Sequence, residues 1–169
     1  MKMREENAAL FAGEAVFTTG PDEVAELKRR ALASDRHGFR LCMHRDNDQP
    51  VLEALVTATP AGTRPPHAHR DRYETHLILE GEVTAFFFNE HGILTRRIDL
   101  GPPGGDKPFC LSAGPGHWHM IAFRSEMVVY YEITAGPYVK PGMPDWAAWA
   151  PAPDDVAGIA ELVQRLEAE

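Results

Sequence analysis

Residues 62–82 read GTRPPHAHRDRYETHLILEGE and hold three histidines and a glutamate within ten positions: His67, His69, Glu74 and His76. Side chains alternate between the two faces of a strand, so His67 and His69 are expected to point the same way, as are Glu74 and His76. A bend between the two pairs would bring all four together. Imidazole and carboxylate groups are the usual protein ligands of Fe, Mn, Ni, Cu and Zn. The stretch therefore predicts part of a metal site.

A second pair of histidines, His117 and His119, lies downstream in the stretch SAGPGHWHMIAF, residues 112–123. These two are again two positions apart and would share one face of a strand, with Trp118 on the other. Neighbouring residues alone cannot surround an ion, so a site on the first stretch needs a contribution from a distant strand. The second pair can supply it.

The composition of the 169-residue chain is that of an ordinary globular protein, with 44% hydrophobic and 25% charged residues. The formal net charge is −8 and no cluster of Lys and Arg occurs, which argues against nucleic acid as a partner. No apolar run approaches the ~20 residues of a membrane span, so no membrane partner is expected. The first 17 residues lack the apolar core of a signal peptide, and a cytoplasmic location is therefore expected.

Many short strand-like runs separated by Gly and Pro follow one helix-like segment. The pattern predicts a helix within residues 18–34, with Thr19 as its cap and Val24, Leu27, Ala31 and Leu32 as its apolar stripe. A second helix is predicted at the end of the chain, capped by Asp154 or Asp155, with an apolar stripe of Val156, Ile159, Ala160, Val163 and Leu166. The runs between them predict an all-β sandwich or barrel.

The histidines and the glutamate that could bind a metal also fit a known motif. The spacing Gly62-x4-His67-x-His69-x4-Glu74-x6-Gly81 resembles the first motif of the cupins, and Gly116-x2-His119 resembles the core of their second motif. Between about residues 22 and 151 the chain most resembles the WbuC-type cupin-fold metalloproteins, in stretches such as FFFNEHG, AGPGHWH and WAAWAP. The leading glycine lies one residue closer to His67 than in the usual motif. His76 occupies a position that is commonly aromatic or aliphatic.

The resemblance implies a cupin-type double-stranded β-helix, a jelly-roll barrel, with an N-terminal helix and a short C-terminal helix. The expected division is a single cupin domain over residues 1–169: an N-terminal helical extension (1–36), a β-barrel (37–139), and a Pro/Trp-rich segment with the terminal helix (140–169). The resemblance also implies one divalent transition metal, Fe, Mn, Ni or Zn, held by His67, His69, Glu74 and His119. Cupin barrels commonly pair through strand edges, so a homodimer is expected.

The catalytic residues are unknown at this stage, and the candidates are His76, Glu132 and His117. His76 has the parity of Glu74, but a core histidine bonded to a carbonyl is the plainer explanation. Glu132 lies in the apolar run VVYYEIT, where it needs either a wet cavity or an ion pair. Three further residues are candidates for a substrate pocket: Arg64, Arg72 and Tyr130. For the two arginines, which could hold an anionic substrate, solvated surface side chains are the plainer explanation.

Three kinds of function agree with these residues. The first is a metal-dependent enzyme that acts on a small polar molecule such as a sugar derivative, by isomerisation, epimerisation or oxygenation. The second is a small-ligand-binding or sensor module without catalysis, because fold alone does not decide function. The third is a structural zinc site, which the hard carboxylate ligand and the absence of cysteine ligands disfavour.

Overall fold

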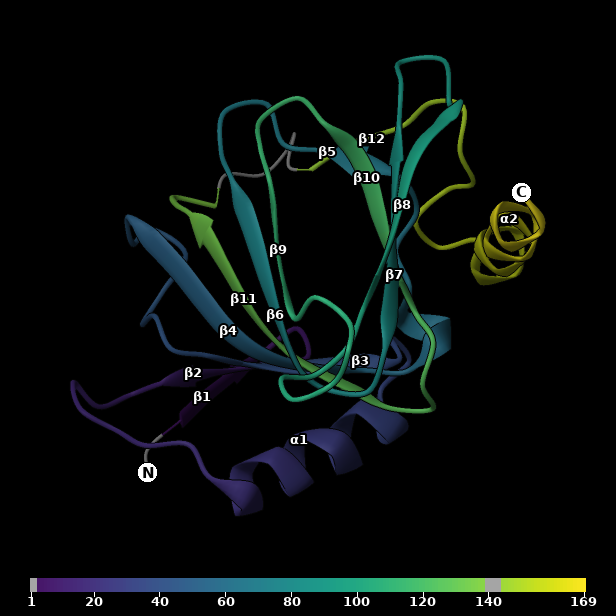
Figure 1. The fold of residues 1–169 in the computed structure, drawn as a ribbon. Helices are drawn as coiled ribbons and strands as arrows, with labels where there is room; N and C mark the ends of the chain where they lie inside the picture. Colours follow the sequence, from purple (N-terminus) through teal and green to yellow (C-terminus); the bar gives the residue numbers. More distant parts are fainter. Residues whose placement is uncertain (1–2, 139–143) are drawn as a thin grey trace.

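A computed structural model of the chain describes residues 3–138 and 144–169, and in these residues two β-sheets face each other (Figure 1). The seven-stranded sheet has the order β1-β2-β3-β4-β11-β6-β9, and the five-stranded sheet the order β12-β5-β10-β7-β8. Early and late strands alternate in the part β4-β11-β6-β9 of the larger sheet and in the part β12-β5-β10-β7 of the smaller one, as in a jelly roll. The predicted all-β fold with a helix near each end is therefore confirmed.

The strands of the larger sheet are β1 (Met3–Glu6), β2 (Ala9–Ala12), β3 (Gly38–Cys42), β4 (Val51–Ala58), β6 (Glu74–Glu80), β9 (Cys110–Ala113) and β11 (Val128–Ala135). Those of the smaller sheet are β5 (His67–Ala68), β7 (Val83–Phe88), β8 (Leu94–Leu100), β10 (Trp118–Phe123) and β12 (Asp145–Trp146). Two helices, α1 (Pro21–Ala33) and α2 (Val156–Ala168), and the short 3₁₀ helix η1 (Pro60–Gly62) complete the described elements.

The N-terminal end of α1 differs from the predicted one. Its cap is Gly20, whose backbone N–H donates to the Glu23 carboxylate at 2.8 Å, so the prediction of a Thr19 cap was wrong. Glu23 satisfies the first exposed donor by reaching back, and no side-chain oxygen at the cap position is needed. Pro21 occupies the first helical position, as expected.

One face of α1 covers the outer face of the seven-stranded sheet, as Figure 1 shows. Leu27 and Ala31 are buried there against Leu41 of β3 and Leu55 of β4. The predicted stripe was too wide, because Leu32 points away from the sheet and is 71% exposed. Burial of these aliphatic groups, at ~25 cal/mol per Å², holds the helix on the barrel.

The C-terminal helix α2 covers the outer face of the five-stranded sheet. Asp155 caps it and accepts a hydrogen bond from the Gly158 N–H at 2.9 Å. Ile159, Leu162 and Leu166 pack against a group of sheet residues that includes Phe86 and Met120. Val156 and Ala160, predicted to belong to the apolar stripe, face solvent instead, and Leu162, which was not predicted, is buried.

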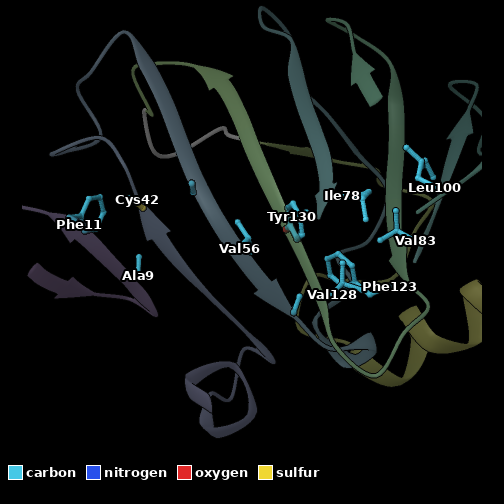
Figure 2. Close-up of a cluster of buried hydrophobic side chains, with 13 residues drawn as sticks. Ala9, Phe11, Cys42, Val56, Ile78, Val83, Leu100, Phe123, Val128 and Tyr130 are labelled. Carbon is cyan, nitrogen blue, oxygen red and sulfur yellow. The ribbon is translucent and has the colours of Figure 1, made fainter. Parts of the chain in front are cut away.

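The space between the sheets is filled at one end by a cluster of buried side chains, shown in Figure 2. Val56 and Tyr130 reach this cluster from the larger sheet, and Val83 and Phe123 from the smaller one. Alternate residues of the same strands point to opposite layers, since Leu55 meets α1 while Val56 points inward. The barrel interior not filled by this cluster is where polar side chains converge.

Strands β1 and β2 have no counterpart among the sequence expectations. They form a hairpin in which Glu6 pairs with Ala9, and both turn residues, Asn7 and Ala8, have positive φ angles of 52° and 61°. Such a turn normally carries glycine at its second position. Alanine is found here instead, so the sequence lacks the usual hairpin signal. The hairpin extends the larger sheet because β2 pairs in parallel with β3.

Candidate metal centre

Four side chains from both sheets converge inside the barrel. His67 lies on β5 and is paired in register with His119 on β10, His69 follows β5, and Glu74 begins β6. One ligand atom from each of these four residues lies within 4.8 Å of all the others. Strands separated by about fifty residues in sequence thus deliver their imidazoles to one point. The structure brings together all four residues expected to be metal ligands.

Glu74 occupies the middle of this group. Its Oε2 lies 3.1 Å from Nε2 of His119, and its Oε1 lies 3.4 Å from Nε2 of His69. The side chains of His69 and Glu74 are each only 10% exposed. Both ring nitrogens of His69 are buried without a hydrogen-bond partner among the described residues. A buried polar atom without a partner is costly, and a bound ion would remove that cost for Nε2.

Backbone carbonyls fix the orientation of two imidazoles. Nδ1 of His67 lies 2.9 Å from the Pro65 carbonyl oxygen, and Nδ1 of His119 lies 2.8 Å from that of His117. A carbonyl oxygen only accepts, so in both rings Nδ1 carries the hydrogen and donates. The lone pair is then on Nε2, the atom turned toward the cluster. Histidines that bind metals are generally held this way.

At His67 and Glu74 the electrostatics favour the protonation states that a metal requires, whereas at His119 burial is outweighed by the hydrogen bond and charge of Glu74, which raise the pKa. Burial, followed by the neighbouring His119, lowers the pKa of His67 to about 4, so this imidazole is neutral at pH 7. Burial alone would raise the pKa of Glu74, but His76, His119 and His69 outweigh it and hold that pKa well below its usual range. Three imidazoles and an ionised carboxylate are a donor set that fits a divalent transition ion.

Behind Glu74, a second group extends the polar interior. His76 on β6 and Glu132 on β11 are opposite each other in the larger sheet, and Glu74, His76 and Glu132 offer ligand atoms within 4.8 Å of one another. Nε2 of His76 lies 3.9 Å from both Glu74 Oε2 and Glu132 Oε2. These distances exceed those of hydrogen bonds but suit ion pairs or a bridging water.

The third candidate for a catalytic role, His117, lies elsewhere. Its side chain is exposed, and its Nδ1 lies 3.0 Å from the Pro115 carbonyl oxygen. It belongs to neither group of converging ligand atoms among the described residues. His117 contributes its backbone carbonyl, which orients His119, and its imidazole faces solvent.

Three of the four converging residues, His67, His69 and Glu74, line a cavity of about 760 Å³. Tyr130, one of the pocket candidates, is 8% exposed and lies with its ring centroid 5.4 Å from that of His76. Burial, together with Glu132, raises the pKa of Tyr130, so its hydroxyl stays protonated. Trp146 on β12 also lines the cavity, with its ring 5.4 Å from that of His67. The cavity is large enough for a small organic molecule.

The two arginines singled out in the sequence differ in their environment, although both line the cavity. Arg72 is 7% exposed, and its guanidinium donates to the carbonyls of Ala135 and Pro137 and to the Asp71 carboxylate. Arg64 makes no hydrogen bond or ion pair within residues 3–138 and 144–169. Arg72 thus ties strands together, whereas Arg64 keeps its donors available.

Two further cavity residues, Arg36 and Arg40, were not identified from the sequence. Arg40 lies on β3, and its Nη1 is 3.8 Å from Oε1 of Glu132. A signal for Arg40 existed, because alternation on this strand sets Arg40 and Cys42 against the outward-facing Phe39 and Leu41. Arg36 lies in the turn after α1, where no strand parity applies.

Comparison with known proteins agrees with the architecture. Residues 21–100 match the model of a family described as a domain of unknown function (DUF6016), and no curated protein matches the chain. CapF, in a crystal structure with the inhibitor 3-isopropenyl-tropolone, superposes with a TM-score of 0.52 and 18% identity, over 66% of this chain and 31% of CapF. The chain thus spans less than a third of the length of CapF.

Two shorter proteins have lower TM-scores. An uncharacterized conserved protein with a double-stranded β-helix domain from Klebsiella pneumoniae gives 0.49 at 22% identity, covering 73% of this chain and 91% of that protein. KdgF from Halomonas sp. gives 0.47 at 13% identity, covering 61% and 82%.

No helix in the described residues is long and apolar enough to cross a membrane. The two facing sheets, the strand order and the similarity to CapF agree with the motif spacing of the sequence. The chain has the cupin fold, a double-stranded β-helix, with a group of three histidines and one glutamate inside the barrel that could hold a metal ion.

Proposed function

We propose that this chain is a metal-dependent cupin enzyme. One divalent transition ion is bound by His67, His69, Glu74 and His119, and the substrate is a small polar organic molecule such as a sugar derivative. The observation that carries the proposal is the convergence of four ligand atoms within 4.8 Å, beside a cavity of about 760 Å³ that three of the four residues, His67, His69 and Glu74, line. A purely structural ion would not need such a cavity beside it.

Bound there, the ion would act as a Lewis acid or redox centre, and four protein ligands leave one or two positions of an octahedral ion free. The chain's own residues would position the substrate and move protons. His76 and Glu132, 3.9 Å apart and next to Glu74, are the candidates for proton transfer. Tyr130 would offer a protonated hydroxyl beside them.

The reaction class that we propose is isomerisation or epimerisation of a sugar, or oxygenation of a small organic acid. The resemblance to the WbuC-type proteins supports the sugar derivative. The alternative is a non-catalytic binding or sensor cupin, which the wall formed by Trp146 next to His67 also supports, because an aromatic ring suits a bound ligand as well as a substrate. A structural zinc site is the third and weakest possibility.

Metal analysis tests the ligand set. Protein purified without chelator is expected to contain about one transition ion per chain, and the double variant His67→Ala/His69→Ala is expected to contain almost none. A matched control removes two exposed histidines instead, in the variant His91→Ala/His117→Ala, and should keep the metal. Retention of the ion by the first double variant would contradict the proposed ligands.

Activity assays separate the enzyme from the binding module. The metal-loaded protein is expected to take up oxygen or to turn over a member of a panel of sugars and keto acids. Binding of a panel member without turnover would instead support the sensor alternative. Stoichiometric zinc with no exchangeable position would support the structural site.

We further propose that residues 1–169 act as a single cupin domain and that the protein is a cytoplasmic homodimer. The edge strands of the two sheets, β1, β9, β12 and β8, carry unpaired backbone groups that a second copy can cover. Light scattering is expected to give about twice the chain mass of 18.8 kDa. A mass near that of one chain would contradict the dimer.

A further inference from the structure

Three arginines from three separate segments line the same cavity as the metal-type residues. Arg36 follows α1, Arg40 lies on β3, and Arg64 precedes β5. Like charges in one cavity repel each other, and the repulsion destabilises the folded state unless a counter-charge is present. We therefore ask which of these arginines has an acidic side chain beside it.

The counter-charges are unevenly distributed. Glu132 lies 3.8 Å from Arg40 and compensates it, and Arg72 is compensated by Asp71. Within the described residues, the Arg64 guanidinium donates no hydrogen bond and forms no ion pair. Partial burial, and after it the charges of Arg36 and Arg40, lower the pKa of Arg64. The residue is nevertheless exposed to solvent on the side of the cavity, so its guanidinium is accessible to a ligand.

The position of Arg64 relates this charge to the metal-type group. Only two residues, Pro65 and Pro66, separate Arg64 from His67, so the two Cα atoms lie within about 11 Å of each other. The Pro65 carbonyl also orients the imidazole of His67. Because Arg64 and His67 both line the cavity, a small molecule bound there can contact both residues.

We propose that Arg64 is the anchor for an oxyanion of the ligand, so that the molecule bound in this cavity is an anionic sugar derivative carrying a carboxylate or a phosphate. The planar guanidinium offers a fork of donors that matches either group bidentately. Arg36 adds positive charge beside it. The identification of the ligand as a substrate rests on the proposed function, but the anion site itself does not.

Calorimetric titration with three related sugars tests the proposal: glucuronate, glucose 6-phosphate and neutral glucose. The wild-type protein is expected to bind at least one of the anions more tightly than glucose. Arg64→Gln is expected to weaken that anion about tenfold to hundredfold and to leave glucose unchanged. The anion that loses more identifies the group, carboxylate or phosphate, that the site prefers.

Two further variants control for charge and folding. Arg96→Gln removes an exposed arginine on β8, outside the cavity, and should bind as the wild type does. Arg64→Lys keeps the charge but not the fork, and should lose less affinity than Arg64→Gln. Because Arg64→Gln removes like-charge repulsion, its unliganded melting temperature should equal or exceed that of the wild type.

The proposal is overturned if neither anion binds at millimolar concentration, if glucose binds as tightly as both anions, or if Arg64→Gln binds them as the wild type does. Its failure is separate from that of the metal site. Arg64-dependent binding in a protein that contains no metal would sink the proposed function and keep the anion site. If the metal-loaded protein binds the anions equally well with and without Arg64, the anion site is contradicted and the proposed metal site is not.

Discussion

The two His-x-His sequences of this chain look alike and have different outcomes. In the first, His67 and His69 both turn into the barrel, with their ring centroids 5.4 Å apart. In the second, His119 is 1% exposed and contacts Glu74, whereas His117 lies on the surface. Two histidines at the same spacing thus give two candidate ligands in one place and one in the other.

The difference comes from the backbone just before each pair. Pro65 and Pro66, whose rings fix φ at about −65°, lead directly into β5, whereas Gly116, with φ of 75°, forms a tight turn before β10. Side-chain parity holds within extended backbone and is lost in a turn. The two motifs are also joined directly, because the Gly116 N–H donates to the His69 carbonyl at 2.7 Å.

The largest effect is expected from single substitutions in the second pair. His119→Ala removes one of four candidate ligands and should lower metal affinity by more than the ~10–100-fold that follows loss of a residue supporting a ligand. His117→Ala should leave the affinity unchanged, because its backbone carbonyl still accepts from His119. Competition with a metal indicator measures both affinities. Equal losses in the two variants would contradict the assignment of His119, but not His117, as a metal ligand.

A second experiment concerns the first pair and pH. The pKa of His67 is lowered from 6.5 to about 4 in the folded, metal-free protein, chiefly by burial. Between these pH values the unfolded chain binds a proton that the folded one does not, so acid should destabilise the fold by up to about 3 kcal/mol. The stabilisation is present above pH 6.5 and disappears as the pH falls toward 4.

Urea unfolding in the presence of chelator, at several pH values, measures this dependence. In His67→Gln the acid-dependent loss should be smaller by that amount. The pKa of His119 is raised instead, because Glu74 outweighs the effect of burial, so its contribution changes only above pH 6.5. Parallel pH profiles for the wild type and His67→Gln would contradict a buried neutral His67.

The smallest effect is expected at the turn that separates the two motifs. A side chain at Gly116 would meet no other atom within 4 Å, so Gly116→Ala tests the backbone conformation alone. A left-handed residue other than glycine costs ~1–2 kcal/mol, and the free energy of unfolding should fall by about that amount. Thermal or urea denaturation measures it; no change would mean that the turn adapts freely.

Much of this architecture was accessible from the sequence because local patterns encode it. Alternating apolar residues predicted the strands of the barrel, and the resemblance to the two cupin motifs predicted which side chains would meet. The cap of α2 at Asp155 was confirmed for the same reason: a short-range hydrogen bond needs only neighbouring residues.

The remaining features depend on partners that lie far away in the chain. Arg72 was a candidate for the substrate pocket, with a solvated side chain as the alternative, but its acceptors at Ala135 and Pro137 lie more than sixty positions downstream. Arg36 enters the cavity only because α1 packs against β3 and β4. The sequence did not predict the hairpin of β1 and β2, because its turn carries Ala8 in a conformation usually taken by glycine.

The short pairing of β12 with β5 has a consequence for synthesis on the ribosome. Trp146, beside His67, emerges almost eighty residues after it, and the partner His119 about fifty residues after it. Domains begin to fold as the chain emerges, but here His67 and His69 can join the complete site only after β10 and β12 have been synthesised. We therefore expect nascent chains that end before residue 119 to lack the complete ligand set, and those that end before residue 146 to lack the wall beside it.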